Sequence, residues 1–142
     1  MFKTIEDASI NFCIHQLREN HLLKDGISDK RTLIAYIDIN IEDDTKHRVY
    51  IASDESFMQK VSKIFLEEDE SDEETLIDMS LETANLIIGS AKVLAEDSDT
   101  LSYAISTPHF EKIGVFDFAY DHAKTIVVED SELTIAIKEL NV

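Results

Sequence analysis

An acid and an amide, Glu82 and Asn85, lie one turn apart in the longest helical pattern of the sequence and are the residues best placed to do chemistry. With about 3.6 residues per turn, four residues fall within roughly 60° of one another around the helix axis, namely Asp78, Glu82, Asn85 and Gly89. Asn is a weaker helix former than Glu, Lys or Gln, and a Gly inside a helix costs about 1 kcal/mol relative to Ala. These residues contribute little to folding, which makes the stripe a candidate site.

The apolar face of the same helix is centred roughly 140° away from this stripe, so we expect the stripe to lie outside the core. The apolar face comprises Ile77, Leu81, Ala84, Ile88, Ala91 and Ala95. Three further apolar side chains, Met79, Leu86 and Val93, flank the stripe outside the core-facing arc. They are predicted to ring a contact surface, although a second helix packed alongside would explain them equally well.

Other catalytic constellations are missing from the sequence. It has no Gly-rich phosphate loop, nucleophile elbow, CxxC or HExxH pattern. The five histidines (His15, His21, His47, His109, His122) are scattered without ligand spacing, so no metal site is predicted. The chemistry left open is that of a protein that supplies one or two groups to a site on another molecule.

Composition limits the class of protein. The chain has 142 residues and a formal net charge of −17, which predicts one domain over 1–142 and argues against binding to nucleic acid or to an anionic membrane surface. The single Cys13 excludes an internal disulfide and is expected to be a small buried residue. No secretory signal and no apolar stretch of bilayer length is visible, so we expect a cytoplasmic protein.

The elements before the central helix are predicted from periodicity. Residues 4–23 are ambiguous between helix and strand, and we favour helix, ended by Gly26 before a polar loop to about Arg31. Two strands follow, 32–41 and 47–52, close enough to pair as a hairpin. Ser53 is then expected to cap a helix to about Leu66. Its predicted buried side is Phe57, Val61, Ile64 and Phe65.

The acidic run 67–74 is interpreted as a solvated linker, because it lacks the Gly that a calcium loop requires. Ser71 and Glu74 have the spacing of a capping box, which starts the central helix at about Asp72 and lets it run to about Glu96.

The remainder is predicted to be sheet, with strands at 100–106, 112–119, 124–128 and 132–137 in a meander, broken at Pro108 and turning at Asp130-Ser131. The order of elements predicts an α+β fold. It would have a mostly antiparallel sheet, two long helices (N-terminal and central) packed on one face, and a shorter third helix.

The pattern Asp78-x3-Glu82-x2-Asn85, with Gly89 after it and Pro108 following the Asn after twenty-two intervening residues, resembles the signature of the CheC/CheX/FliY phosphatases of bacterial chemotaxis. The resemblance extends from about residue 30 to the end of the chain. Only one copy of the helix pattern is present, which resembles the CheX branch. Ala84 departs from the family, many of whose members have Gly before the Asn.

The resemblance implies a phosphatase that accelerates hydrolysis of the aspartyl phosphate on a CheY-type response regulator. Asn85 would orient the attacking water, and Glu82 would pair with the regulator's active-site lysine. The partner-binding residues would include Asp78, Met79, Leu86 and Gly89. The protein would need no cofactor of its own, since Mg²⁺ belongs to the regulator. Family resemblance also implies a homodimer joined through sheet edges.

Two alternatives stay open. The same helix would also suit a non-catalytic module that docks a regulator or flagellar-switch protein. A purely structural domain, whose polar stripe packs against the N-terminal helix, would bury both Glu82 and Asn85 and satisfy them within the chain.

Overall fold

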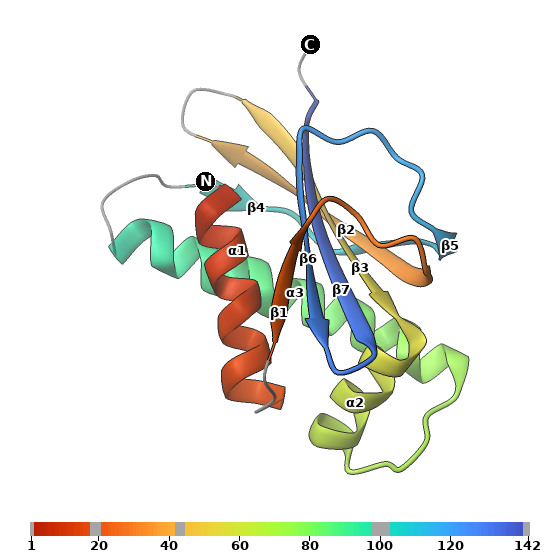
Figure 1. The fold of residues 1–142 in the computed structure, drawn as a ribbon. Helices are drawn as coiled ribbons and strands as arrows, with labels where there is room; N and C mark the ends of the chain where they lie inside the picture. The colour runs from red at the N-terminus through yellow and green to blue at the C-terminus, as the bar shows by residue number, and fades with distance from the viewer. Residues whose placement is uncertain (1, 18–20, 42–44, 98–102, 141–142) are drawn as a thin grey trace.

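The computed structural model describes residues 2–17, 21–41, 45–97 and 103–140 (Figure 1). Within them, helices and an antiparallel sheet form an α+β fold, as predicted. The elements are α1 (Phe2–Asn11), the π-helical turn η1 (Phe12–Leu17), β1 (Leu22–Asp25), β2 (Arg31–Ile41), β3 (Lys46–Asp54), α2 (Glu55–Leu66), α3 (Glu73–Asp97), β4 (Tyr103–Ile105), β5 (His109–Val115), β6 (His122–Val128) and β7 (Ser131–Glu139).

The seven described strands pair in the order β1-β6-β7-β3-β2-β4, and β5 also pairs with β2. The predicted hairpin of β2 and β3 is confirmed, with register from Thr32↔Asp54 to Asn40↔Lys46. The predicted C-terminal meander is only partly right. β6 and β7 form a hairpin, but β7 continues onto β3, and β4 and β5 both cross to the far side of β2. Local turn signals gave no information on these long-range pairings.

The N-terminal segment is helical only in its first part. The predicted helix to residue 23 is wrong at its end, because Leu22 and Leu23 begin the edge strand β1, paired with β6. Gly26 does not terminate a helix; it lies at φ +83° after β1, and its N–H donates to the Ala123 carbonyl. Pairing with a distant strand has overridden the local helical preference here.

The helices pack on one face of the sheet, where α3 contacts α1, α2 and β2 (Figure 1). The large core between these layers is mainly aliphatic, with two buried phenylalanines, and includes Cys13, which is buried as expected. A smaller core of Ile34, Tyr50, Ala52, Phe116 and Ala136 covers the opposite face. The sheet is therefore covered on both sides, and α3 is held by helices as well as by strands.

The helix starts differ from the predicted ones by one residue. Asp54, not Ser53, caps α2, since the Phe57 N–H donates to its Oδ1 over 2.8 Å. At α3 the cap is Asp72, which accepts from the Thr75 N–H over 2.9 Å, whereas the Ser71 hydroxyl donates to Glu68. In both pairs the carboxylate takes the position from the neighbouring hydroxyl.

The buried side of α2 is shorter than predicted. Phe57 and Val61 are fully buried, but Ile64 and Phe65 in the last turn are 45% and 38% exposed. Phe65 still stacks on Phe12, with ring centroids 6.3 Å apart. The last turn of α2 therefore projects past the core.

Candidate functional site on the central helix

The 25-residue helix α3 carries the predicted stripe, and the rest of the molecule fixes its orientation. Its buried arc is wider than periodicity alone suggested, because α1 and α2 cover flanks that a helix lying on a sheet alone would expose. Ile77 and Leu81 are half-buried against the core, and Ala84 is fully buried, so the Ala84 departure lies away from the exposed side. The buried residues are Leu76, Met79, Ser80, Thr83, Ala84, Ile87, Ile88, Ala91 and Ala95.

Asp78, Glu82 and Asn85 all lie exposed on the remaining side of α3. Among the described residues, none makes a hydrogen bond or ion pair with Glu82 or Asn85. A carboxylate and an amide without intramolecular partners on a rigid helix are free to bind groups of another molecule. This exposure disfavours the structural alternative, which required both side chains to be buried and satisfied.

Gly89 is half-buried one turn beyond Asn85. A Cβ added to it would meet no atom within 4 Å, leaving aside the backbone of its own helix. Packing inside the chain therefore does not require glycine at this position, although glycine weakens the helix.

The apolar residues that flank the stripe divide into two groups. Met79 is only 6% exposed and belongs to the core, so its prediction as a surface contact residue is wrong. Met79 lies two turns before Leu86 on nearly the same side of α3, so the cover differs along the helix and not around it. Leu86 and Val93, in contrast, are 38% and 54% exposed. The surface available to a partner thus comprises Asp78, Glu82, Asn85, Leu86, Gly89 and Val93.

Pro108 lies in the three-residue link between β4 and β5, as expected of a strand breaker. Both strands pair with β2, and both contact α3. The proline therefore belongs to the part of the sheet that lies beside the candidate helix.

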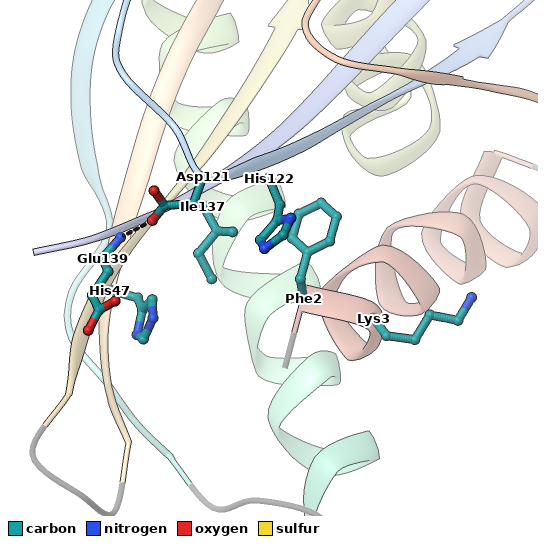
Figure 2. Close-up of a pocket in the computed structure, with 7 residues that line it drawn as sticks. All are labelled: Phe2, Lys3, His47, Asp121, His122, Ile137 and Glu139. Atoms are coloured by element: carbon teal, nitrogen blue, oxygen red, sulfur yellow. Dashed lines mark hydrogen bonds between the residues drawn. The ribbon is translucent and has the colours of Figure 1, made fainter.

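Sequence reasoning missed a separate hollow of about 610 Å³ at the N-terminal end of α1 (Figure 2). His47 and His122, distant in the chain, both line it, and the His122 ring lies 5.7 Å from that of Phe2. The other lining residues are Lys3, Asp121, Ile137 and Glu139. Asp121 is already engaged, since it accepts from the Glu139 N–H and from Lys138. The pairing of β3 and β6 with β7, and the packing of α1 against β6 and β7, bring these residues together, so no local sequence pattern predicts the hollow.

No three His, Cys, Asp or Glu side chains in the described part of the chain are grouped so that they would hold a metal ion. Nor is any helix there long and apolar enough to cross a membrane.

Comparison with known proteins places the chain in a family. Residues 36–130 match the model of the chemotaxis phosphatase CheX. None of the curated proteins matches.

The solved structures most similar in fold include a CheC-like chemotactic protein from Shewanella oneidensis (13% identity, TM-score 0.77, 96% of each chain covered). A second is the chemotaxis protein CheX from Vibrio vulnificus (16% identity, TM-score 0.75, with 95% of this chain and 97% of that chain covered). A third is CheX in a CheX–CheY–BeF3–Mg²⁺ complex from Borrelia burgdorferi (17% identity, TM-score 0.70, with 97% of each chain covered). At these identities the structures support the fold, and the family match covers most of the sequence, including the candidate helix. The chain belongs to the CheX family of chemotaxis phosphatases.

Proposed function

We propose that this protein accelerates hydrolysis of the aspartyl phosphate on a CheY-type response regulator, with Asn85 positioning the attacking water. The observation that carries the proposal is the pair Glu82 and Asn85, which lie exposed one turn apart, without a partner among the described residues, on a helix that is fixed on its other sides. The family match gives the general activity, and a relative of the same fold has been solved with CheY.

The step is a displacement at phosphorus. The water oxygen forms a bond to phosphorus, while the bond from phosphorus to the regulator's aspartyl oxygen breaks. The electron pair of that bond stays on the released carboxylate. The products are the free aspartate and inorganic phosphate, and the proton lost by the water passes to phosphate or solvent.

Asn85 suits this step because an amide both accepts and donates hydrogen bonds. Its oxygen can accept from the water while its NH₂ group donates toward the phosphoryl oxygens. Such catalysis works by orientation, so it requires no nucleophile and no shifted pKa on this chain. Asn85 enters the partner's active site from a rigid helix, which keeps the entropy cost of ordering it low.

Glu82 lies one turn before Asn85 and would pair with the lysine of the regulator's active site. An ion pair formed at the centre of an interface, away from water, fixes the register of the two proteins more strongly than one at the rim. Asp78, a further turn back, adds negative charge to the same stripe.

In this proposal the Mg²⁺ ion resides in the regulator, next to its phosphorylated aspartate. This chain contributes no ligand to the Mg²⁺ ion. Its proposed role is to bind the regulator and to orient the attacking water. A cytoplasmic location is part of the same proposal, and the proposed CheY-type partner supports it.

We also propose that two copies join through an exposed sheet edge. β1 pairs only with β6, and Leu22 on this short strand is 73% exposed, which leaves an uncovered edge of the described sheet. Light scattering coupled to size exclusion would test this. A dimer that Leu22→Lys dissociates supports pairing at β1, whereas a monomeric wild type contradicts it.

The test of the phosphatase proposal is the decay of the phosphorylated CheY-type regulator from the same organism, with and without catalytic amounts of this protein. We expect accelerated decay that is lost in Asn85→Ala and Glu82→Ala. Asn11→Ala, which removes an exposed asparagine from the end of α1, is the matched control and should retain full activity.

The same experiment distinguishes the alternative of a non-catalytic docking module. Wild-type protein that binds the phosphorylated regulator without accelerating its decay would establish that alternative. Turnover that survives in Asn85→Ala would exclude the proposed role of this amide.

A further inference from the structure

The exposed side of α3 changes character at Asn85. On its N-terminal side the stripe is acidic, with Glu74, Asp78 and Glu82 all exposed. On its C-terminal side the exposed residues include two aliphatic ones, Leu86 and Val93, separated by two turns; Ser90, Glu96 and Asp97 are exposed there as well. The stripe therefore offers two kinds of contact to one partner: carboxylates before Asn85, and two aliphatic side chains in the turns that follow it.

Leu86 and Val93 are only partly covered by the described chain, being 38% and 54% exposed. The third apolar residue predicted at this surface, Met79, is covered and belongs to the core. The neighbouring Gly89 leaves the surface between Leu86 and Val93 open, since no atom lies within 4 Å of where its Cβ would be. The aliphatic half is therefore a low, unobstructed surface, continuous with Glu82 and Asn85.

We infer that Leu86 and Val93 bind an apolar surface patch of the phosphorylated regulator and set the affinity of the complex, while Glu82 and Asn85 act at the phosphoryl group. This inference rests on the function proposed above and names how the same site selects its partner. The occupant is the regulator, because a protein whose active site receives Asn85 must extend along the same helix face.

Helix geometry specifies where that patch lies on the partner. At about 1.5 Å per residue, Val93 is roughly 12 Å along the axis from Asn85, and Glu82 lies on the other side of Asn85. The partner should therefore carry a lysine on one side of its phosphorylated aspartate and exposed apolar side chains on the other. A regulator lacking these apolar side chains should be a poor substrate.

Because the aliphatic pair would bind the regulator and Asn85 would orient water, substitutions of the two should change different kinetic parameters. Contacts that are equally strong in the ground and transition states change KM and leave kcat unaltered, whereas a group that orients water changes kcat. Interface side chains that matter typically change affinity about tenfold when truncated. Leu86 and Val93 should thus control KM.

The experiment is a steady-state comparison of Leu86→Ser and Val93→Ser with wild type, using the phosphorylated CheY-type regulator as substrate. Each variant should raise KM about tenfold and leave kcat within about twofold. Ile64→Ser is the matched control, because Ile64 is an exposed aliphatic residue, 45% accessible, near the end of a different helix. It should change neither parameter.

Binding provides an independent readout. The regulator activated with beryllofluoride, which stands in for the phosphoryl group, should bind Leu86→Ser and Val93→Ser about tenfold more weakly than wild type by calorimetry. Circular dichroism should report unchanged folding. If a serine variant fails to fold, Val93→Ala gives the same comparison with a smaller change.

The outcomes separate this inference from the function on which it rests. Wild type that accelerates decay, together with serine variants of unchanged KM, overturns the inference and leaves the phosphatase function standing. A fall in kcat at constant KM also overturns it. Wild type without any effect on decay refutes the phosphatase function itself.

Discussion

The two sides of α3 obey different constraints. Its inner side is occupied by aliphatic and small residues such as Ile88 and Ala91, each fully buried by the sheet and the flanking helices. Its outer side carries Glu82, Asn85 and Gly89, which nothing in the described chain requires. Intramolecular packing explains the residues of the first side, whereas it does not explain those of the second, for which we propose a partner. Substitutions on the inner side should therefore lower the stability of the fold, whereas substitutions on the outer side should lower the activity.

The largest effect should come from the inner side. Ile88→Ala removes a fully buried side chain and should lower the free energy of unfolding by about 3 kcal/mol, because the cavity closes only partly. Leu86→Ala, two positions away but exposed, should change it by less than about 0.5 kcal/mol. Urea denaturation measures both, and similar losses for the two variants would abolish the distinction between the sides.

On the outer side, Asn85→Ala should reduce kcat about 100-fold, the order of effect expected when a reacting group is misplaced. Its midpoint of urea denaturation should not fall, because Asn85 is exposed and unpartnered and Ala is the better helix former. Single-turnover decay of the phosphorylated regulator measures the rate. A variant that lost activity only in proportion to lost folded protein would contradict the assignment.

Gly89→Ala tests the comparison more sharply, because it should raise the free energy of unfolding and lower kcat/KM. The added methyl meets open space within the chain, so the free energy of unfolding should rise by up to about 1 kcal/mol. The same methyl would obstruct a closely approaching partner, so kcat/KM should fall several-fold. Increased stability with unchanged kcat/KM would show that the partner does not approach Gly89.

The smallest effect concerns the start of α3, which both sides share. Hydrogen bonds from Thr75 lower the pKa of Asp72 below its ordinary value of 3.8. The cap therefore stabilises the folded state above pH 3.8, and this stabilisation is lost as the pH falls through the lowered pKa. Asp72→Asn keeps a capping side chain that does not titrate. Thermal unfolding of the variant should depend less steeply on pH below about 4, and an unchanged slope would contradict this.

The sequence predicted the structure best where the relevant pattern lies within one element or between neighbouring elements. The period of α3 separated Glu82 and Asn85 from the core, and strand alternation predicted the hairpin of β2 and β3. Local pattern failed where distant elements decide. Met79 is buried although Leu86, two turns later on nearly the same side of α3, is exposed, and Leu22 joins a strand because it pairs with β6. The hollow beside His47 and His122 depends on three strands and could not be predicted.

Cys13 gives the molecule a built-in reporter. It is the single thiol of the chain, is fully buried in the core with α3, and burial raises its pKa to about 12. In neutral buffer the folded protein should therefore resist alkylation, and a reagent should react only after the N-terminal helical segment has opened. The rate of alkylation then measures how often the core opens beside η1, which packs against α1 and α2. Repeating it with the regulator bound would show whether contact on the outer side tightens the packing behind it.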